Sequence, residues 1–152
     1  MIKRITDPVE FEKVVNDIYL LFKEKDKTDY HALLPHDADS IVRAYGNIKI
    51  LTWDFFVWAN LGDDNKYDAV ISFVNNKNEK FGERIFTEYV WASNNPRVGC
   101  KLLATALKFA KSKEFKYVSM SSVSNHEKSE KITRFYKKLG FLKDSETYVA
   151  QL

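Results

Sequence analysis

The stretch "NNPRVGCKLL" at residues 94–103 has the composition of a helix start that could bind an anion. It lies between a predicted strand, "ERIFTEYVWAS" at 83–93, and an amphipathic segment, "KLLATALKFAKSK" at 101–113. The first N–H groups of a helix have no partner inside it, and with the helix dipole they attract phosphate. We expect free amides over 98–101, and Arg97 can add a bidentate contact to phosphate. The open alternative is a capped helix that binds no ligand.

Other catalytic and metal-binding patterns are weak or missing. His31 and His36 stand five residues apart in a predicted loop with no third ligand nearby, so we predict no metal site. Cys100 is the only cysteine, which excludes an internal disulfide, and we expect it to be a small packing residue rather than a nucleophile. The sequence contains no phosphate loop, dinucleotide fingerprint, nucleophile elbow or HExxH motif.

Composition and charge narrow the class of protein. A chain of 152 residues with 45% hydrophobic residues predicts one domain, 1–152, with a sizeable core. The 24 basic and 21 acidic residues leave a net charge of +3, which is too mild to predict a nucleic-acid partner. The start "MIKRITDPVEF" lacks the apolar region of a signal peptide, and no apolar run reaches membrane-spanning length. We therefore predict a cytoplasmic protein without a membrane partner.

Hydrophobic periodicity predicts the elements that must position these residues. The best-marked boundary is the start of the first helix, where Asp7 can cap, Pro8 suits the first helical position and Glu10 follows three residues after the cap. Apolar residues on both faces of 48–58 predict a central strand covered on both sides. The order β-α-α-β-β-β-α-β-α-β-β predicts an α/β (α+β) fold with a mixed, mostly antiparallel sheet. The predicted elements are strand 2–6, helix 8–24, helix 37–45, strand 48–60, turn 62–65, strand 66–74, turn 75–82, strand 83–92, helix 97–112, strand 115–121, helix 127–139 and two short strands within 141–152.

This order, together with "VGCKLL" at 98–103 and "FYKKLGF" at 135–141, resembles the GNAT superfamily of N-acetyltransferases. The resemblance covers nearly the whole chain in element order and reaches residue types over 88–141. It implies a GNAT-like fold with acetyl-CoA as cosubstrate. In that family a Q/R-x-x-G-x-G/A loop after the fourth strand, with the helix that follows, holds the pyrophosphate of coenzyme A.

By position, the resemblance places an acyl-CoA loop at 94–101. Gly99 falls on the last small residue of the loop, whereas Asn94 stands where Gln or Arg is usual and Arg97 stands where the first glycine is usual. Ser129 lies nearest a frequent asparagine of the family. The resemblance further implies that backbone N–H groups of the fourth strand polarise the thioester carbonyl. The implied cofactor-binding residues are Tyr89, Val90, Trp91, Asn94, Arg97, Val98, Gly99, Cys100, Lys101 and Ser129.

Two residues are implied as catalytic. Tyr136 falls on the family's tyrosine, and a phenol with a pKa near 10 suits protonation of a leaving thiolate; the open alternative is a packed core tyrosine. Glu88 is the candidate base, because it lies on the strand that delivers the carbonyl donors and burial can raise its pKa toward neutrality. A solvent-facing glutamate is the alternative, and Asp54 and Glu83 are other candidate bases.

The resemblance thus implies direct transfer of an acetyl group from acetyl-CoA to a primary amine of a small molecule or peptide. The altered loop keeps a second class open: a catalytically inactive GNAT-fold module that binds or supports a partner. A third class, a nucleic-acid binder, rests on the basic helix predicted at 127–139, for which we favour a solvated surface. A homodimer stays open.

Overall fold

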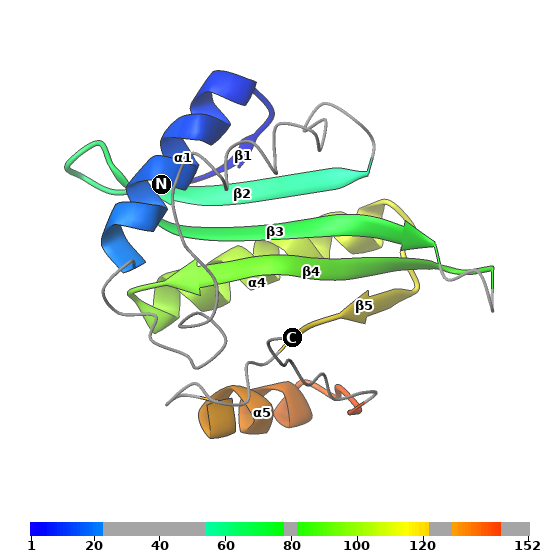
Figure 1. The fold of residues 1–152 in the computed structure, drawn as a ribbon. Helices are drawn as coiled ribbons and strands as arrows, with labels where there is room; N and C mark the ends of the chain where they lie inside the picture. The colour runs from blue at the N-terminus through cyan, green and yellow to red at the C-terminus, as the bar shows by residue number, and fades with distance from the viewer. Residues whose placement is uncertain (23–53, 78–81, 122–128, 144–152) are drawn as a thin grey trace, which may run out of the picture.

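The computed structural model of the protein describes residues 1–22, 54–77, 82–121 and 129–143 (Figure 1). Its centre is one sheet in the order β1-β2-β3-β4-β5. The first four strands pair antiparallel and β5 pairs parallel to β4, so the predicted mixed, mostly antiparallel sheet is confirmed. The elements are β1 (Ile2–Ile5), α1 (Pro8–Phe22), β2 (Phe55–Leu61), β3 (Tyr67–Lys77), β4 (Arg84–Ser93), α4 (Pro96–Ser112), β5 (Tyr117–Ser119) and α5 (Ser129–Lys138).

Among the described strands, β3 and β5 differ most from their predicted bounds. β3 runs on through 75–77, where a turn is predicted, because these residues pair with 84–86 of β4. β5 is shorter than the strand predicted at 115–121, because it pairs with β4 over three residues only. Other predictions lie outside the described residues: the helix at 37–45, the strand segment 48–53, the two histidines at 31 and 36, and most of the final strands at 141–152.

The sheet is covered on both faces, by α1 on one side and by α4 on the other (Figure 1). Successive side chains of a strand point to opposite faces, and β2 therefore serves both layers. Phe55, Val57 and Ala59 pack on the side of α1, whereas Phe56 and Trp58 pack on the side of α4. All five are buried, which confirms the predicted central strand.

The start of α1 follows its predicted cap. The amide of Glu10 donates to Oδ1 of Asp7 at 2.9 Å, as a capping aspartate should arrange. The carboxylate of Glu10 does not complete a reciprocal capping pair, because it serves Tyr67 and Lys3 instead. Contacts with the sheet therefore outweigh the local motif here.

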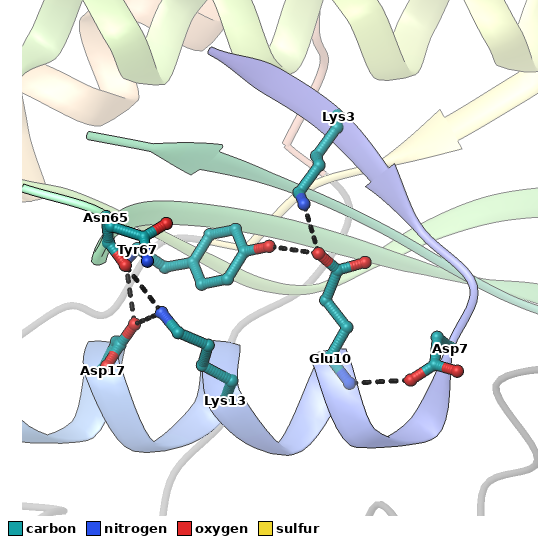
Figure 2. Close-up of polar contacts among 7 residues, drawn as sticks. All are labelled: Lys3, Asp7, Glu10, Lys13, Asp17, Asn65 and Tyr67. Carbon is teal, nitrogen blue, oxygen red and sulfur yellow. Dashed lines mark hydrogen bonds and ion pairs between the residues drawn. The ribbon is translucent and has the colours of Figure 1, made fainter. Parts of the chain in front are cut away.

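A polar cluster fastens α1 to the sheet, and we call its members Lys3, Glu10, Lys13, Asp17 and Tyr67 the α1 clasp (Figure 2). Tyr67 is only 3% exposed; its hydroxyl donates to Oε1 of Glu10 at 2.6 Å and its amide donates to Oδ2 of Asp17 at 2.9 Å. Lys3 pairs with Glu10, and Lys13 pairs with Asp17 at 2.8 Å. The two ammonium groups also lie 5.6 and 4.8 Å from the centroid of the tyrosine ring. The clasp thus joins β1, α1 and the start of β3.

Candidate functional site

β4 is irregular at the stretch that the resemblance assigns to carbonyl polarisation. Ser72 of β3 pairs with Val90, and the next residue, Phe73, pairs with Glu88. Tyr89 is therefore an extra residue in β4, which is the arrangement of a β-bulge. A bulge bends its strand and leaves the extra residue outside the ladder, so β4 changes course at this point.

β4 and β5 separate next to the bulge. Their pairing ends at Thr87 and Ser119, although β4 continues to Ser93. Among the described residues, no pair joins the two strands beyond this point. Backbone groups of 88–93 that face away from β3 consequently lack a partner in β5.

The two predicted catalytic residues meet where this ladder ends. The amide of Ser121 donates to Oε2 of Glu88 at 2.8 Å, and the carbonyl of Ser121 accepts from the hydroxyl of Tyr136 at 2.8 Å. A side chain from β4 and a side chain from α5 thus satisfy the two backbone groups of one residue. We call Glu88, Ser121 and Tyr136 the Ser121 cluster. Ser121 carries no signal in the sequence, because hydrogen bonds to its backbone place no requirement on its side chain.

Tyr136 lies in an aromatic environment and is only 8% exposed. Its ring centroid lies 6.3 Å from that of Trp91 and 5.4 Å from that of Phe141. Burial raises the pKa of Tyr136 above its usual range, and the nearby negative charge of Glu88 raises it further. The hydroxyl therefore stays protonated at neutral pH and serves as a hydrogen-bond donor. Tyr136 is thus packed among aromatic rings and hydrogen-bonded as well, and its catalytic role stays a prediction.

Glu88 is half-buried rather than facing solvent. Burial raises the pKa of its carboxyl above the usual range, and the hydrogen bonds from Ser121 offset part of that rise. No cation among the described residues forms an ion pair with it. A carboxyl of this kind can accept a proton at higher pH than an exposed one, which a general base requires.

The other candidate bases lie elsewhere. Oδ1 of Asp54 accepts from the side chain of Asn75 at 3.0 Å on an exposed part of the surface. Glu83 pairs with Lys116 at 2.9 Å near the start of β4. Neither carboxylate bonds to the Ser121 cluster, so the structure brings Glu88 alone of these three to Tyr136.

The start of α4 corrects one prediction. Asn95 caps the helix: its side chain accepts from the amide of Arg97 at 3.0 Å, and its carbonyl accepts from the amide of Gly99 at 2.9 Å. The expectation of free amides over 98–101 is therefore wrong for most of the stretch, because the later residues bond within the helix. The amide of Val98 has no acceptor within α4, because the residue four positions earlier precedes the helix.

Gly99 serves close packing between α4 and the end of β4. A Cβ placed on this buried glycine would lie 3.3 Å from Cβ of Ser93 and 3.5 Å from Nε1 of Trp91. That indole nitrogen is itself buried and has no hydrogen-bond partner among the described residues. The absence of a side chain on this glycine therefore allows β4 and its tryptophan to pack closely against the start of α4.

The remaining predicted loop residues face solvent. Cys100 is exposed, so its predicted packing role is wrong; the helix turns Gly99 inward and its neighbour outward. Ser129 opens α5, and its side chain lies outside the description. Asn94, Arg97 and Lys101 are exposed at the start of α4.

Among the described residues, no three histidine, cysteine, aspartate or glutamate side chains gather as a metal site would require. None of the helices in this part of the chain combines the length and the apolar character needed to cross a membrane.

Comparisons with known proteins place this geometry in context. No protein-family model and no curated protein matches the sequence. Among solved structures, an aminoglycoside acetyltransferase from an uncultured soil metagenomic sample, in complex with sisomicin, has a TM-score of 0.68 at 15% identity, covering 100% of this chain and 96% of the other. A GNAT family acetyltransferase from Staphylococcus aureus has a TM-score of 0.66 at 13% identity, with coverage of 99% and 98%. An acetyltransferase from Trypanosoma brucei has a TM-score of 0.66 at 12% identity, with coverage of 100% and 99%.

Likeness at such low identity is informative about the fold alone. It extends over essentially the full length of both chains in each comparison. The described elements occur in the order that the sequence predicts, with an antiparallel run followed by a parallel crossover. The chain therefore has the mixed α/β fold of the GNAT acetyltransferases, as its sequence predicts.

Proposed function

We propose that the protein is an acyl-CoA-dependent N-acetyltransferase that moves an acetyl group from acetyl-CoA directly to a primary amine. The single observation that supports this most is the Ser121 cluster. A half-buried carboxylate without a described cation and a buried phenol hydroxyl converge where β4 and β5 separate. A fold alone does not determine function, and this pair of groups adds the chemistry that acetyl transfer needs.

The residues around this point suit an extended ligand with an anionic end. The backbone groups of β4 beyond Thr87 can pair with the amides of an extended arm, as a sheet edge does. The amide of Val98 and the exposed cations Arg97 and Lys101 can bind phosphate. Because Asn95 already occupies one amide, these side-chain cations would contribute more to phosphate binding than in a glycine-rich loop.

The chemistry divides among the residues as follows. Bound acetyl-CoA would supply a thioester carbonyl, and N–H groups of Tyr89, Val90 or Trp91 would polarise it. Glu88 would accept a proton from the acceptor ammonium, for which its raised pKa suits it. Tyr136 would protonate the departing thiolate, and its hydroxyl must first leave the carbonyl of Ser121.

Transfer is tested by incubating the protein with acetyl-CoA and a panel of amines. Aminoglycosides belong in the panel because a structural neighbour is an aminoglycoside acetyltransferase solved with sisomicin; polyamines and peptides should be included as well. We expect free thiol and N-acetylated product to form in equal amounts, measured with a thiol reagent and by mass spectrometry.

Cosubstrate binding is tested separately by thermal shift. Acetyl-CoA at one hundred times its dissociation constant should add about 2.7 kcal/mol to the free energy of unfolding. No shift at millimolar acetyl-CoA, together with no product from any amine, would contradict the proposal. It would favour the inactive module, for which the Asn95 cap and the arginine at the first glycine position are the supporting observations.

A further inference from the structure

The outer side of α4 carries four cations and no acidic residue. At 3.6 residues per turn, these side chains fall within about 80° of the helix circumference, on the side opposite the buried residues. All four are exposed. We call this set the α4 ridge: Arg97, Lys101, Lys108 and Lys111.

The ridge is electrostatically unfavourable in the isolated chain. None of its members forms an ion pair with a residue that the structure describes. Arg97 stands in the first turn, where the helix dipole favours anions and where α4 has no acidic residue. Arg97 with Lys101, and Lys108 with Lys111, are like-charge neighbours at helical spacing, which repel each other. A bound polyanion would offset the repulsion between these cations and the unfavourable interaction of Arg97 with the helix dipole.

Acetyl-CoA does not account for the whole ridge. With a rise of 1.5 Å per residue, Arg97 and Lys111 are about 21 Å apart along the helix. A pyrophosphate at the first turn of α4 would contact Arg97 and Lys101. Lys108 and Lys111 would stand about 15 to 20 Å from the amide of Val98, beyond its reach.

We infer that the α4 ridge is a docking surface for the phosphate backbone of a nucleic-acid double helix. Protein interfaces have an apolar core, whereas no large apolar side chain of α4 is among the markedly exposed ones. Backbone contacts to nucleic acid need only cations and small polar groups, and the ridge is interrupted by Ala104, Thr105 and Ser112. It also lacks an exposed aromatic ring for stacking single-stranded bases.

The α4 ridge runs against the earlier conclusion that the net charge is too mild to predict a nucleic-acid partner. The net charge of +3 averages the ridge with acidic residues elsewhere in the chain, so it hides four cations on one side of a single helix. Contact with phosphates releases counterions, and affinity therefore falls steeply with salt. Lys108 and Lys111 take no part in the proposed reaction, so a test at these two residues is independent of acetyl transfer.

The test uses the full chain and fluorescein-labelled duplex DNA and duplex RNA of random sequence, with anisotropy measured between about 50 and 200 mM salt. The slope of log affinity against log salt should be about −3 for three to four phosphate contacts. The double variant Lys108→Gln/Lys111→Gln should reduce the size of the slope by about two and should weaken binding at least tenfold at low salt. Acetyl transfer should be unchanged in this variant.

The matched control is Lys66→Gln/Lys77→Gln, which removes two exposed lysines from β3 and the turn before it. It should leave the slope and the affinity unchanged. Equal loss in the control, or no binding to either duplex at low salt, would overturn the inference. Tighter binding to polyglutamate than to both duplexes would also overturn it and would assign the ridge to an acidic protein. The comparison of the DNA and RNA arms identifies which duplex is preferred.

Discussion

Two regions of the molecule combine a glutamate with a buried tyrosine, and they differ in what surrounds the carboxylate. In the α1 clasp, Tyr67 donates directly to Glu10 at 2.6 Å, and a lysine of β1 pairs with the same oxygen. In the Ser121 cluster, Glu88 and Tyr136 bond to different backbone atoms of Ser121, and no described cation stands beside the carboxylate.

This difference reverses the shift in pKa. The hydrogen bond from Lys3, followed by that from Tyr67, lowers the pKa of Glu10 below its usual range. Burial raises the pKa of Glu88. A carboxylate that is paired with a cation stays charged and is suited to holding elements together. A half-buried carboxylate without such a cation is suited to taking up a proton. The same two residue types thus serve structure at one place and suit chemistry at the other.

The largest expected effect separates the two glutamates by activity. Glu88→Gln should lower the rate of acetyl transfer by about 10²- to 10⁴-fold, the usual contribution of a general base, while the fold is kept. Glu10→Gln is the matched control and should leave the rate unchanged well below its melting temperature. Initial rates at pH 7 with the best amine of the panel provide the measurement. Equal rates for the wild type and Glu88→Gln would remove this residue from the mechanism.

The two tyrosines should differ in the same way. Tyr136→Phe should reduce turnover by about a hundredfold, the lower end for a general acid, while the dissociation constant of acetyl-CoA stays the same, because the ring keeps its packing and only the proton donor is lost. Steady-state kinetics and a direct binding titration separate the two quantities. Tyr67→Phe should leave turnover unchanged, and an unaltered rate in Tyr136→Phe would leave that residue with a packing role only.

Stability should rank the tyrosines in the opposite order. Tyr67→Phe should lower the free energy of unfolding by about 1.5 to 3 kcal/mol, because its buried hydroxyl bonds to a charged group. Tyr136→Phe should cost about 0.5 to 1.5 kcal/mol, because its hydroxyl bonds to a neutral carbonyl. Urea unfolding of the two variants beside the wild type measures both changes. A larger loss for Tyr136→Phe would show that the Ser121 cluster holds the fold more firmly than the clasp does.

The pH dependence of stability should have opposite signs at the two glutamates. The lowered pKa of Glu10 contributes stability above its unfolded pKa, near 4.5, and that contribution is lost as pH falls through the folded value. The raised pKa of Glu88 works the other way, since stability declines as pH rises from about 4.5 through the folded value. Measured between about pH 3 and 8, the unfolding free energy of Glu10→Gln should therefore fall below that of the wild type as pH rises through the folded pKa of Glu10, whereas that of Glu88→Gln should rise relative to the wild type as pH passes through the folded pKa of Glu88.

The smallest effect should come from the exposed side of the clasp. Lys3→Met removes an ion pair whose two side chains are both about one-third exposed, where water and salt screen the attraction. We expect a loss of stability smaller than that of Tyr67→Phe, and smaller still in high salt. If Lys3→Met cost as much as Tyr67→Phe, the ion pair rather than the tyrosine would be the main contact of the clasp.

Local signals were sufficient for much of the fold. The aspartate and proline at the start of α1, the Gly-Asp-Asp-Asn turn at 62–65 and the two-sided apolar pattern of β2 each depend on neighbours in the sequence. The β3 extension to Lys77 is different, because cross-strand pairing with β4 overrides turn-forming asparagines. The inward Gly99 and outward Cys100 differ by one helical position, which the predicted boundary did not resolve.

The sequence by itself determined the order of the described elements and, through the resemblance, pointed to the side chains of Glu88 and Tyr136. Only the tertiary structure decided that both bond to Ser121, which lies 33 and 15 residues away from them along the chain. It also decided which glutamate carries a raised pKa. Burial and neighbouring charge set that value, and both arise from contacts between residues that are distant in the sequence.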